Sequence, residues 1–212
     1  MSKKYEAYEK VKSLILNHQL SPGQKLIYRD LEEKIGMTKT PIINGLIMLE
    51  KEGFVIAKKN RGFYCSEINS GEAKQIFDLR EKLENLAVEY AVGNYIKEDL
   101  EILKRKLKEY DAYPSLIYDN KRLFLDTGFH LQIAMMGKNP FLFEILKQFY
   151  ENVYFKLDVA YLTPGIKKFK KEHNILFEAI KKKDLRLAKR ILRDHNRLGK
   201  EFFCSMNLVP SF

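Results

Sequence analysis

The stretch from Lys168 to Phe203 constrains the fold most, because it contains two amphipathic helical segments separated by a short break at residues 182–184. His173 lies eleven residues before Asp184, and His195 lies eleven residues after it. In an antiparallel helix pair, a rise of about 1.5 Å per residue places both histidines roughly 16 Å from the turn, at one height. Both also fall on apolar stripes: Phe169, His173, Leu176 and Ile180, and Leu187, Ile191, His195, Leu198 and Phe202. Two polar rings at one level of a core need partners.

Composition limits the class of protein. The 212 residues are 45% hydrophobic and 31% charged, which is typical of a globular chain with one large core or two small ones. No apolar run approaches eighteen residues, and the start does not resemble a signal peptide, so we expect a cytoplasmic protein without a membrane span. Cys65 and Cys204 sit in no metal-binding motif and are expected to be reduced. The net charge of +10 favours a polyanionic partner, although a general lysine bias explains it equally well.

Residues 1–68 have the pattern of three helices followed by a β-hairpin. Apolar residues recur at helical spacing, and Gly36 and Gly53 are suited to end the second and third helices. The pair Leu26-Ile27 indicates a short strand. The expected helices cover residues 5–17, 29–35 and 38–52, and the expected hairpin strands cover 54–58 and 63–66. This order of elements predicts a winged helix-turn-helix.

The third helix and the hairpin of this domain carry side chains suited to DNA. A helix fits the major groove, where its N-terminal end presents N–H groups and short polar side chains to the bases. A basic wing tip is suited to phosphate or minor-groove contact. The residues assigned to DNA are Arg29 in the second helix, Thr38, Lys39, Thr40 and Asn44 in the third, and Lys59, Asn60, Arg61 and Gly62 in the wing. The expected partner is double-stranded operator DNA.

Four segments give this domain a family pattern: residues 20–26 (LSPGQKL), 35–42 (IGMTKTPI), 49–54 (LEKEGF) and 60–62 (NRG). With them, residues 5–66 resemble the GntR family of bacterial transcription regulators. That family typically reads S-R-T-P-V-R-E-A-L where this chain reads T-K-T-P-I-I-N-G-L. Lys39 and Ile43 replace arginines and Asn44 replaces a glutamate, which weakens bidentate base contact. We expect altered or less stringent operator choice; a degenerate domain that no longer binds DNA is the alternative.

Residues 69–212 read as wholly helical after a short polar linker, Asn69-Ser70-Gly71, with no strand pattern. The expected helices cover residues 72–92, 97–110, 116–136 and 141–161, and the pair described above adds two more after a break at Thr163-Pro164-Gly165. The expected fold class is therefore mainly α. It combines an N-terminal winged helix-turn-helix of three helices and a β-hairpin wing, residues 1–68, with an all-α six-helix bundle, residues 69–212.

The helical half places one carboxylate and three imidazoles on core-facing stripes. Asp126 and His130 are four residues apart and therefore share a helix face. With His173 and His195 they form a donor set that suits zinc, nickel or a similar divalent ion and leaves coordination positions open. The alternative is that each buried histidine is hydrogen-bonded to a backbone carbonyl. The spacing alone leaves both interpretations open.

Further motifs in this half are R-x-x-L-E at residues 80–84, D-x-x-x-H at 126–130, E-H at 172–173 and a final histidine at 195. With them the half resembles the FadR-type C-terminal effector domain, called FCD. The resemblance implies that Asp126, His130, His173 and His195 hold a divalent transition metal, expected to be zinc, with nickel or manganese as alternatives. It also implies a small organic acid that chelates the metal beside Arg80, for which a surface salt bridge to Glu84 is the alternative. Asn152 and Tyr154, on the aromatic fourth helix, are further candidate effector contacts.

Three functional hypotheses follow. The first is a homodimeric transcription regulator, in which an effector shifts the two winged helices and so changes operator affinity. The second is a DNA-binding regulator with a purely structural metal. The third is a metal-dependent hydrolase, for which Glu172 is the one acid beside the donor set and the winged helix has no role.

Overall fold

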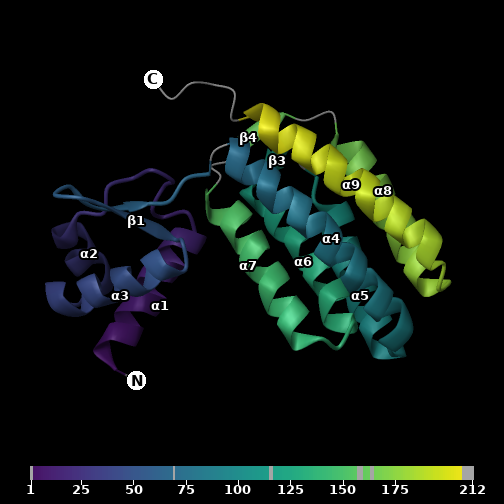
Figure 1. Cartoon of the computed structure of the whole chain (residues 1–212), viewed down its shortest axis with the longest axis horizontal. Coiled ribbons are helices and arrows are strands. Elements are labelled where there is room, and N and C mark those ends of the chain that lie inside the picture. Colours follow the sequence, from purple (N-terminus) through teal and green to yellow (C-terminus); the bar gives the residue numbers. More distant parts are fainter. Residues whose placement is uncertain (1, 69, 115–116, 157–159, 163–164, 207–212) are drawn as a thin grey trace. The chain divides into compact units, whose positions relative to one another are not determined.

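The computed structural model describes residues 2–68, 70–114, 117–156, 160–162 and 165–206 (Figure 1). By their contacts the residues form two compact units, Met1–Ile68 with Glu151–Asp158, and Asn69–Tyr150 with Val159–Phe212. The sequence placed residues 151–158 in the helical half, whereas these contacts group them with the first unit. The predicted linker residue Asn69 and the predicted break at Thr163-Pro164 lie outside the described residues.

The first unit is a winged helix-turn-helix. Its elements are α1 (Lys3–Leu16), α2 (Tyr28–Ile35), α3 (Lys39–Lys51), β1 (Val55–Lys58) and β2 (Gly62–Cys65). The two strands are antiparallel, and Val55 lies opposite Cys65. A bridge between Lys25 and Tyr64 adds a third segment to this sheet, one residue before the strand expected at Leu26-Ile27. The core is apolar and includes Val11, Ile15, Leu31, Ile42, Leu46 and Leu49.

The second unit is a bundle of helices. Its elements are α4 (Ser70–Asn94), α5 (Lys97–Ala112), β3 (Ile117–Asp119), α6 (Asn120–Met136), α7 (Pro140–Lys156), β4 (Ala160–Leu162), α8 (Ile166–Lys181) and α9 (Leu185–Met206). The predicted fold class, a winged helix-turn-helix joined to six helices, is confirmed. Some details differ. α4 already begins at Ser70, α6 begins only at Asn120 instead of residue 116, and α7 ends at Lys156 instead of residue 161. In addition, β3 pairs antiparallel with β4 where no strand was expected. Three residues are too few to show the period-two pattern of a strand.

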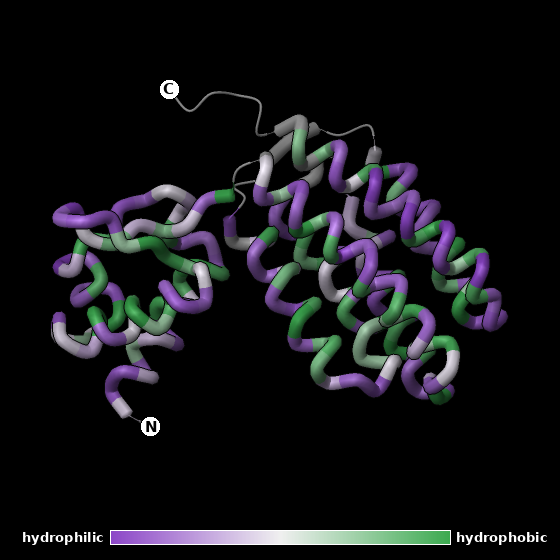
Figure 2. Tube along the Cα trace, viewed as in Figure 1, coloured by the Kyte–Doolittle hydropathy of each residue, from purple (hydrophilic) through white to green (hydrophobic). Residues whose placement is uncertain are grey.

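The α8–α9 pair turns where the sequence predicted. Lys183 adopts a left-handed backbone conformation with φ 57°, and the Asp184 carboxylate accepts a hydrogen bond from the Leu187 amide at 2.9 Å. This side chain caps the first turn of α9. In Figure 2 hydrophilic and hydrophobic residues alternate along the turns of α9, as expected of a helix with one buried face.

The bundle core lies where α4, α5, α6, α8 and α9 meet. Its fully buried residues include Val88, Leu103, Phe129, Leu176, Ile180 and Leu192. A smaller apolar cluster, containing Ala87, Ala134, Leu142 and Leu146, packs α7 onto α4 and α6. Within the described residues every helix is too short or too polar to cross a lipid bilayer.

The close approach of α3 to α1 predicts that a single methyl group destabilises the first unit. A Cβ at Gly45 would lie 2.8 Å from the Tyr8 amide nitrogen, which is backbone and cannot rotate away. Gly45→Ala is expected to lower the free energy of unfolding by about 1–3 kcal/mol through overpacking, although alanine is the better helix former. Urea unfolding followed by circular dichroism measures this. Gly93→Ala, on α4 with open space around the position, is the control and should not destabilise; equal effects of both substitutions would contradict the packing argument.

Candidate functional site

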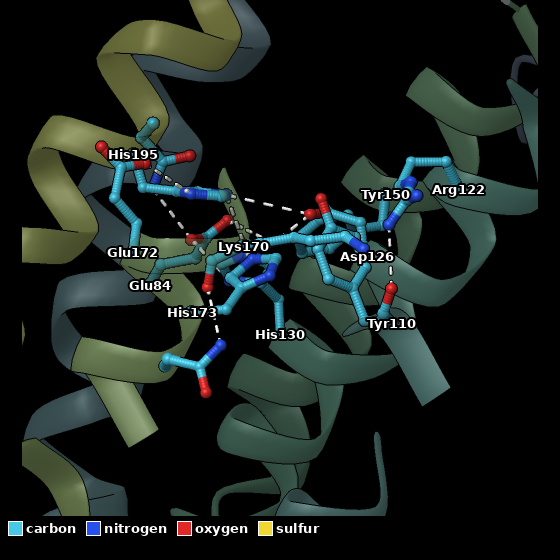
Figure 3. A network of polar contacts seen from close by, with 12 residues as sticks. Glu84, Tyr110, Arg122, Asp126, His130, Tyr150, Lys170, Glu172, His173 and His195 are labelled. Atoms are coloured by element: carbon cyan, nitrogen blue, oxygen red, sulfur yellow. Dashed lines mark hydrogen bonds and ion pairs between the residues drawn. The ribbon is translucent and has the colours of Figure 1, made fainter. Parts of the chain in front are cut away.

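Asp126, His130, His173 and His195 converge inside the bundle (Figure 3). Each offers one ligand atom, and these atoms all lie within 4.8 Å of one another. The Nε2 atom of His130 is 3.1 Å from that of His173 and 3.2 Å from that of His195. Asp126 Oδ1 is 3.3 Å from His173 Nε2 and 3.9 Å from His195 Nε2. All four side chains are buried, and we call them the donor cluster.

Local sequence spacing accounts for this convergence. Asp126 and His130 are one helical turn apart on α6, so both project from the same face. His173 on α8 and His195 on α9 are equidistant from the turn at Asp184, and their ring centroids lie 4.6 Å apart. The predicted level of the two histidines is therefore observed.

The protonation of the donor cluster favours a cation at its centre. Burial lowers the pKa of His130 and His173 well below the usual range, so both rings are neutral at pH 7. His195 Nδ1 lies 3.1 Å from a Glu172 oxygen, which can accept a hydrogen bond from an Nδ1–H group. His130 Nδ1 faces a Glu84 oxygen at 3.5 Å. The Nε2 atoms of both rings point toward the centre of the donor cluster, where they face each other at 3.2 Å.

Asp126 also favours a cation at the centre of the donor cluster. Its Oδ1 atom is buried and accepts no hydrogen bond, and burial raises the pKa of this carboxyl. A buried acceptor without a donor is costly. Two atoms that bind one zinc ion at about 2.1 Å lie roughly 3–3.5 Å apart, which is close to the separations in the cluster. The donor set therefore fits a divalent transition ion.

Glu84 on α4 connects the donor cluster to its surroundings. One carboxylate oxygen accepts from the Tyr150 hydroxyl at 2.6 Å and from Arg80 Nε at 3.0 Å. The other accepts from Asn196 Nδ2 at 2.8 Å and faces His130 Nδ1. This carboxylate orients a ring of the donor cluster and neutralises Arg80. Its place in R-x-x-L-E was visible in the sequence, but three of its four partners lie on other helices.

Arg80 is buried beside the donor cluster. Its guanidinium carbon lies 3.9 Å from the Tyr150 ring centroid and 4.7 Å from that of Phe77. Burial opposes its charge, but Tyr150 and Glu84 hold the pKa of Arg80 above its ordinary value. The ion pair with Glu84, expected at the surface, is present, but both side chains are only 3–4% exposed.

Arg122 and Tyr110 border the donor cluster, and neither was predicted as a site residue from the sequence. Arg122 is fully buried and donates to the backbone carbonyls of Tyr110 and Tyr113, both at 2.8 Å. It thereby ties the end of α5 to α6. The Tyr110 ring packs edge-on against His173 with centroids 4.5 Å apart. The pair Lys121-Arg122 has no sequence signal that separates it from ordinary surface charge.

The other predicted effector contacts lie elsewhere along the chain. Asn152 and Tyr154 lie near the end of α7, in the part of this helix that groups with the first unit rather than with the donor cluster. The Tyr154 ring lies 5.0 Å from that of His18 in the same unit. The role of Asn152 and Tyr154 as effector contacts stays a prediction.

The residues assigned to DNA lie at two exposed places of the first unit. Thr38, Lys39, Thr40 and Asn44 occupy the first turns of α3, and Lys59, Asn60 and Arg61 occupy the wing tip. Lys39 Nζ lies 5.0 Å from the Tyr28 ring, which brings the start of α2, with the exposed Arg29, beside the start of α3. At the wing, Gly62 has a φ of 88°, a conformation that glycine adopts readily. All except the half-buried Gly62 are exposed.

Comparisons with known proteins decide the family. Residues 3–65 match the model described as bacterial regulatory proteins, gntR family, and residues 75–198 match the FCD domain. The chain belongs to the GntR family and contains an FCD domain. Both resemblances noted in the sequence are thereby confirmed.

Its relatives are regulators as well. The HTH-type transcriptional regulator YdhC of Bacillus subtilis, described as uncharacterized, is 27% identical over 190 residues, 89% of this chain and 85% of the relative. McbR of Escherichia coli is 27% identical over 177 residues, 80% of each chain. The solved structure of E. coli McbR/YncC superimposes with a TM-score of 0.73 at 20% identity, covering 97% of this chain and 99% of the other, which shows a shared fold. This GntR/FCD protein is thus a DNA-binding transcription regulator and not an enzyme, which removes the hydrolase hypothesis.

The buried pair predicts a non-additive effect on stability. Glu84→Leu leaves the Arg80 guanidinium buried without its carboxylate, and breaking such a pair costs about 3–5 kcal/mol. The double variant Arg80→Met/Glu84→Leu removes both charges and should be more stable than Glu84→Leu alone. Urea denaturation of the two single variants and the double variant measures the coupling. A double variant that merely sums the two single losses would show that the pair is not the source of the cost.

Proposed function

We propose that this chain is a ligand-responsive, homodimeric, cytoplasmic regulator whose helical unit holds a divalent transition metal and a small organic acid. The proposed metal ligands are Asp126, His130, His173 and His195; zinc is the expected ion, with nickel or manganese as alternatives. The observation that carries the proposal is the convergence of four buried ligand atoms within 4.8 Å. The acid changes the affinity of the protein for operator DNA.

The class of effector follows from the charge around the donor cluster. A bound divalent ion supplies positive charge and open coordination positions for a carboxylate. Arg80 adds a guanidinium that pairs with carboxylates through two parallel hydrogen bonds. Glu84 engages Arg80 through Nε, so the two terminal nitrogens of Arg80 are the proposed donors to the acid. Asn152 and Tyr154 remain proposed contacts that select among acids.

The nearby carboxylates have a positioning role in this proposal. Glu172 accepts from His195 Nδ1 and Glu84 faces His130 Nδ1, which fixes the tautomer that turns each Nε2 lone pair inward. Such outer carboxylates orient a ligating imidazole and increase its basicity. Although Glu172 precedes His173 in the sequence, it serves the other histidine of the α8–α9 pair.

We propose that the exposed first turns of α3 and the wing contact operator DNA. Two half-sites one helical turn apart require two recognition helices, which is why a homodimer is proposed. The proposed contacts are Arg29, Thr38, Lys39, Thr40, Asn44, Lys59, Asn60, Arg61 and Gly62. With Lys39 and Ile43 in place of family arginines, fewer bidentate contacts to guanine are available.

A gel-shift assay with the promoter region of the chain's own gene tests DNA binding. Lys39→Ala should weaken the specific complex roughly tenfold, because one charged contact at the groove is lost. Lys51→Ala removes the same charge from the exposed far end of α3 and should change binding little. The proposal would be contradicted if the chain bound its promoter no more tightly than unrelated DNA and if Lys39→Ala left both affinities unchanged.

Chelation and acid binding should shift the melting temperature in opposite directions. Removal of the ion leaves a buried carboxylate and neutral imidazoles without a cation, so the melting temperature falls. A matching carboxylate should then stabilise the metal-loaded protein by about 3 kcal/mol at a hundred times its Kd. A thermal-shift panel of hydroxy acids and sugar acids measures both effects. His195→Ala should abolish both effects, whereas Lys104→Ala, at an exposed position of α5, should keep them.

A purely structural metal is the second candidate function of the site. It is favoured by the fact that the protein itself supplies four ligand atoms, enough to complete a tetrahedral shell. This alternative predicts that a chelator lowers the melting temperature and that no acid in the panel raises it.

A further inference from the structure

The outer face of α9 concentrates arginine. Arg186, Arg190, Arg193 and Arg197 recur every three or four residues and so share one face of the helix. All four are exposed. The chain has 29 lysines and only nine arginines, and four of those nine fall within this stretch of twelve residues. A general lysine bias does not produce such a concentration.

Three of these arginines border a cavity between α4 and α9. The cavity measures about 460 Å³, and its lining includes Arg190, Arg193, Arg197 and the acidic Asp194 from α9 together with Phe77 and Glu81 from α4. Gly199 permits the close approach of the helices, because a Cβ there would lie 3.2 Å from the Phe77 ring. Cavities of several hundred Å³ suit small molecules. We call this cavity the α4–α9 groove.

Two of the guanidinium groups at the groove have no partner in the part of the chain that the structure describes. Among the described residues, no hydrogen bond or ion pair engages Arg190 or Arg193, whereas Arg197 lies 3.4 Å from Asp194 and Lys200 pairs with Asp78. Arginine presents a planar fork of donors that matches phosphate oxygens in pairs. Arg190 and Arg193 therefore offer unused donors beside a concave surface.

Asn196 supplies a second, independent observation. It lines the groove but is only 2% exposed, and its Nδ2 donates to Glu84. Because a carboxylate accepts only, the amide must turn its oxygen away from Glu84. That oxygen is buried and receives no hydrogen bond. This oxygen therefore lacks a donor, and because less than 1 Å² of it is exposed, a ligand hydroxyl can supply one only after the Asn196 side chain turns toward the groove.

We propose that the α4–α9 groove binds a small phosphorylated polyol. The phosphate contacts Arg190 and Arg193, and a hydroxyl donates to the Asn196 oxygen. This ligand differs from the carboxylate proposed at the donor cluster, and its binding does not require the metal.

Isothermal titration of the full chain with ribose 5-phosphate, glycerol 3-phosphate and glucose 6-phosphate tests the proposal. At least one should bind saturably, while glucose and inorganic phosphate bind more weakly or not at all. Arg190→Gln/Arg193→Gln should weaken binding roughly tenfold or more, since two charged hydrogen-bond donors are lost. Lys104→Gln/Arg105→Gln removes the same charge from exposed positions of α5 and should leave the affinity unchanged.

Three results would overturn the proposal. The first is the absence of saturable heat with all three sugar and polyol phosphates. The second is an equal loss of affinity in the α5 control, which would reduce binding to net charge. The third is a double variant that binds duplex DNA of unrelated sequence more weakly at low salt while the chain binds none of the phosphates, which would make the arginine face a DNA-contacting surface.

Discussion

The Nε2 atoms of His130 and His195 face each other across 3.2 Å in the interior of the helical bundle. Both are turned inward because a carboxylate engages the opposite side of each ring. Asp126 adds a buried oxygen without a hydrogen-bond donor to the same point. The proposed divalent ion would lie between these atoms of α6 and α9 and offset the repulsion of their lone pairs.

Glu84 extends this dependence to the rest of the unit. It contacts His130 of the donor cluster, the buried guanidinium of Arg80 and the amide of Asn196 at the α4–α9 groove. A change in the position of one partner therefore alters hydrogen bonds to the other two. Such a shared carboxylate provides a physical contact between the proposed acid site and the proposed phosphate site, although each site is testable without the other.

The sequence predicted what depends on local periodicity. The shared helix face of Asp126 and His130 and the equal height of His173 and His195 follow from helix geometry. That all four residues form one set was implied by the resemblance to the FCD domain, and the four side chains do converge. The family resemblance rested on short motifs in both halves, and both family models match. The winged helix and the six helices could be predicted because the apolar residues of each helix recur with local periodicity.

Contacts between distant segments could not be predicted in this way. Glu172 is next to His173 in the chain but contacts His195, because neighbouring residues of a helix point in different directions. The pairing of Ile117 with Leu162 depends on how α6 and α7 return along the bundle, which no short pattern encodes. The burial of Arg122 depends on two carbonyl oxygens, of Tyr110 and Tyr113, that accept from its guanidinium at the end of α5.

Elemental analysis of the purified full chain tests whether the donor cluster holds a divalent transition ion, and it needs neither the effector nor the operator. After extensive dialysis against metal-free buffer, the wild-type protein should retain about one divalent transition ion per chain, and Asp126→Ala/His195→Ala should retain little. Wild-type protein that is folded, metal-free and unable to take up zinc, nickel or manganese would contradict a metal site at the donor cluster.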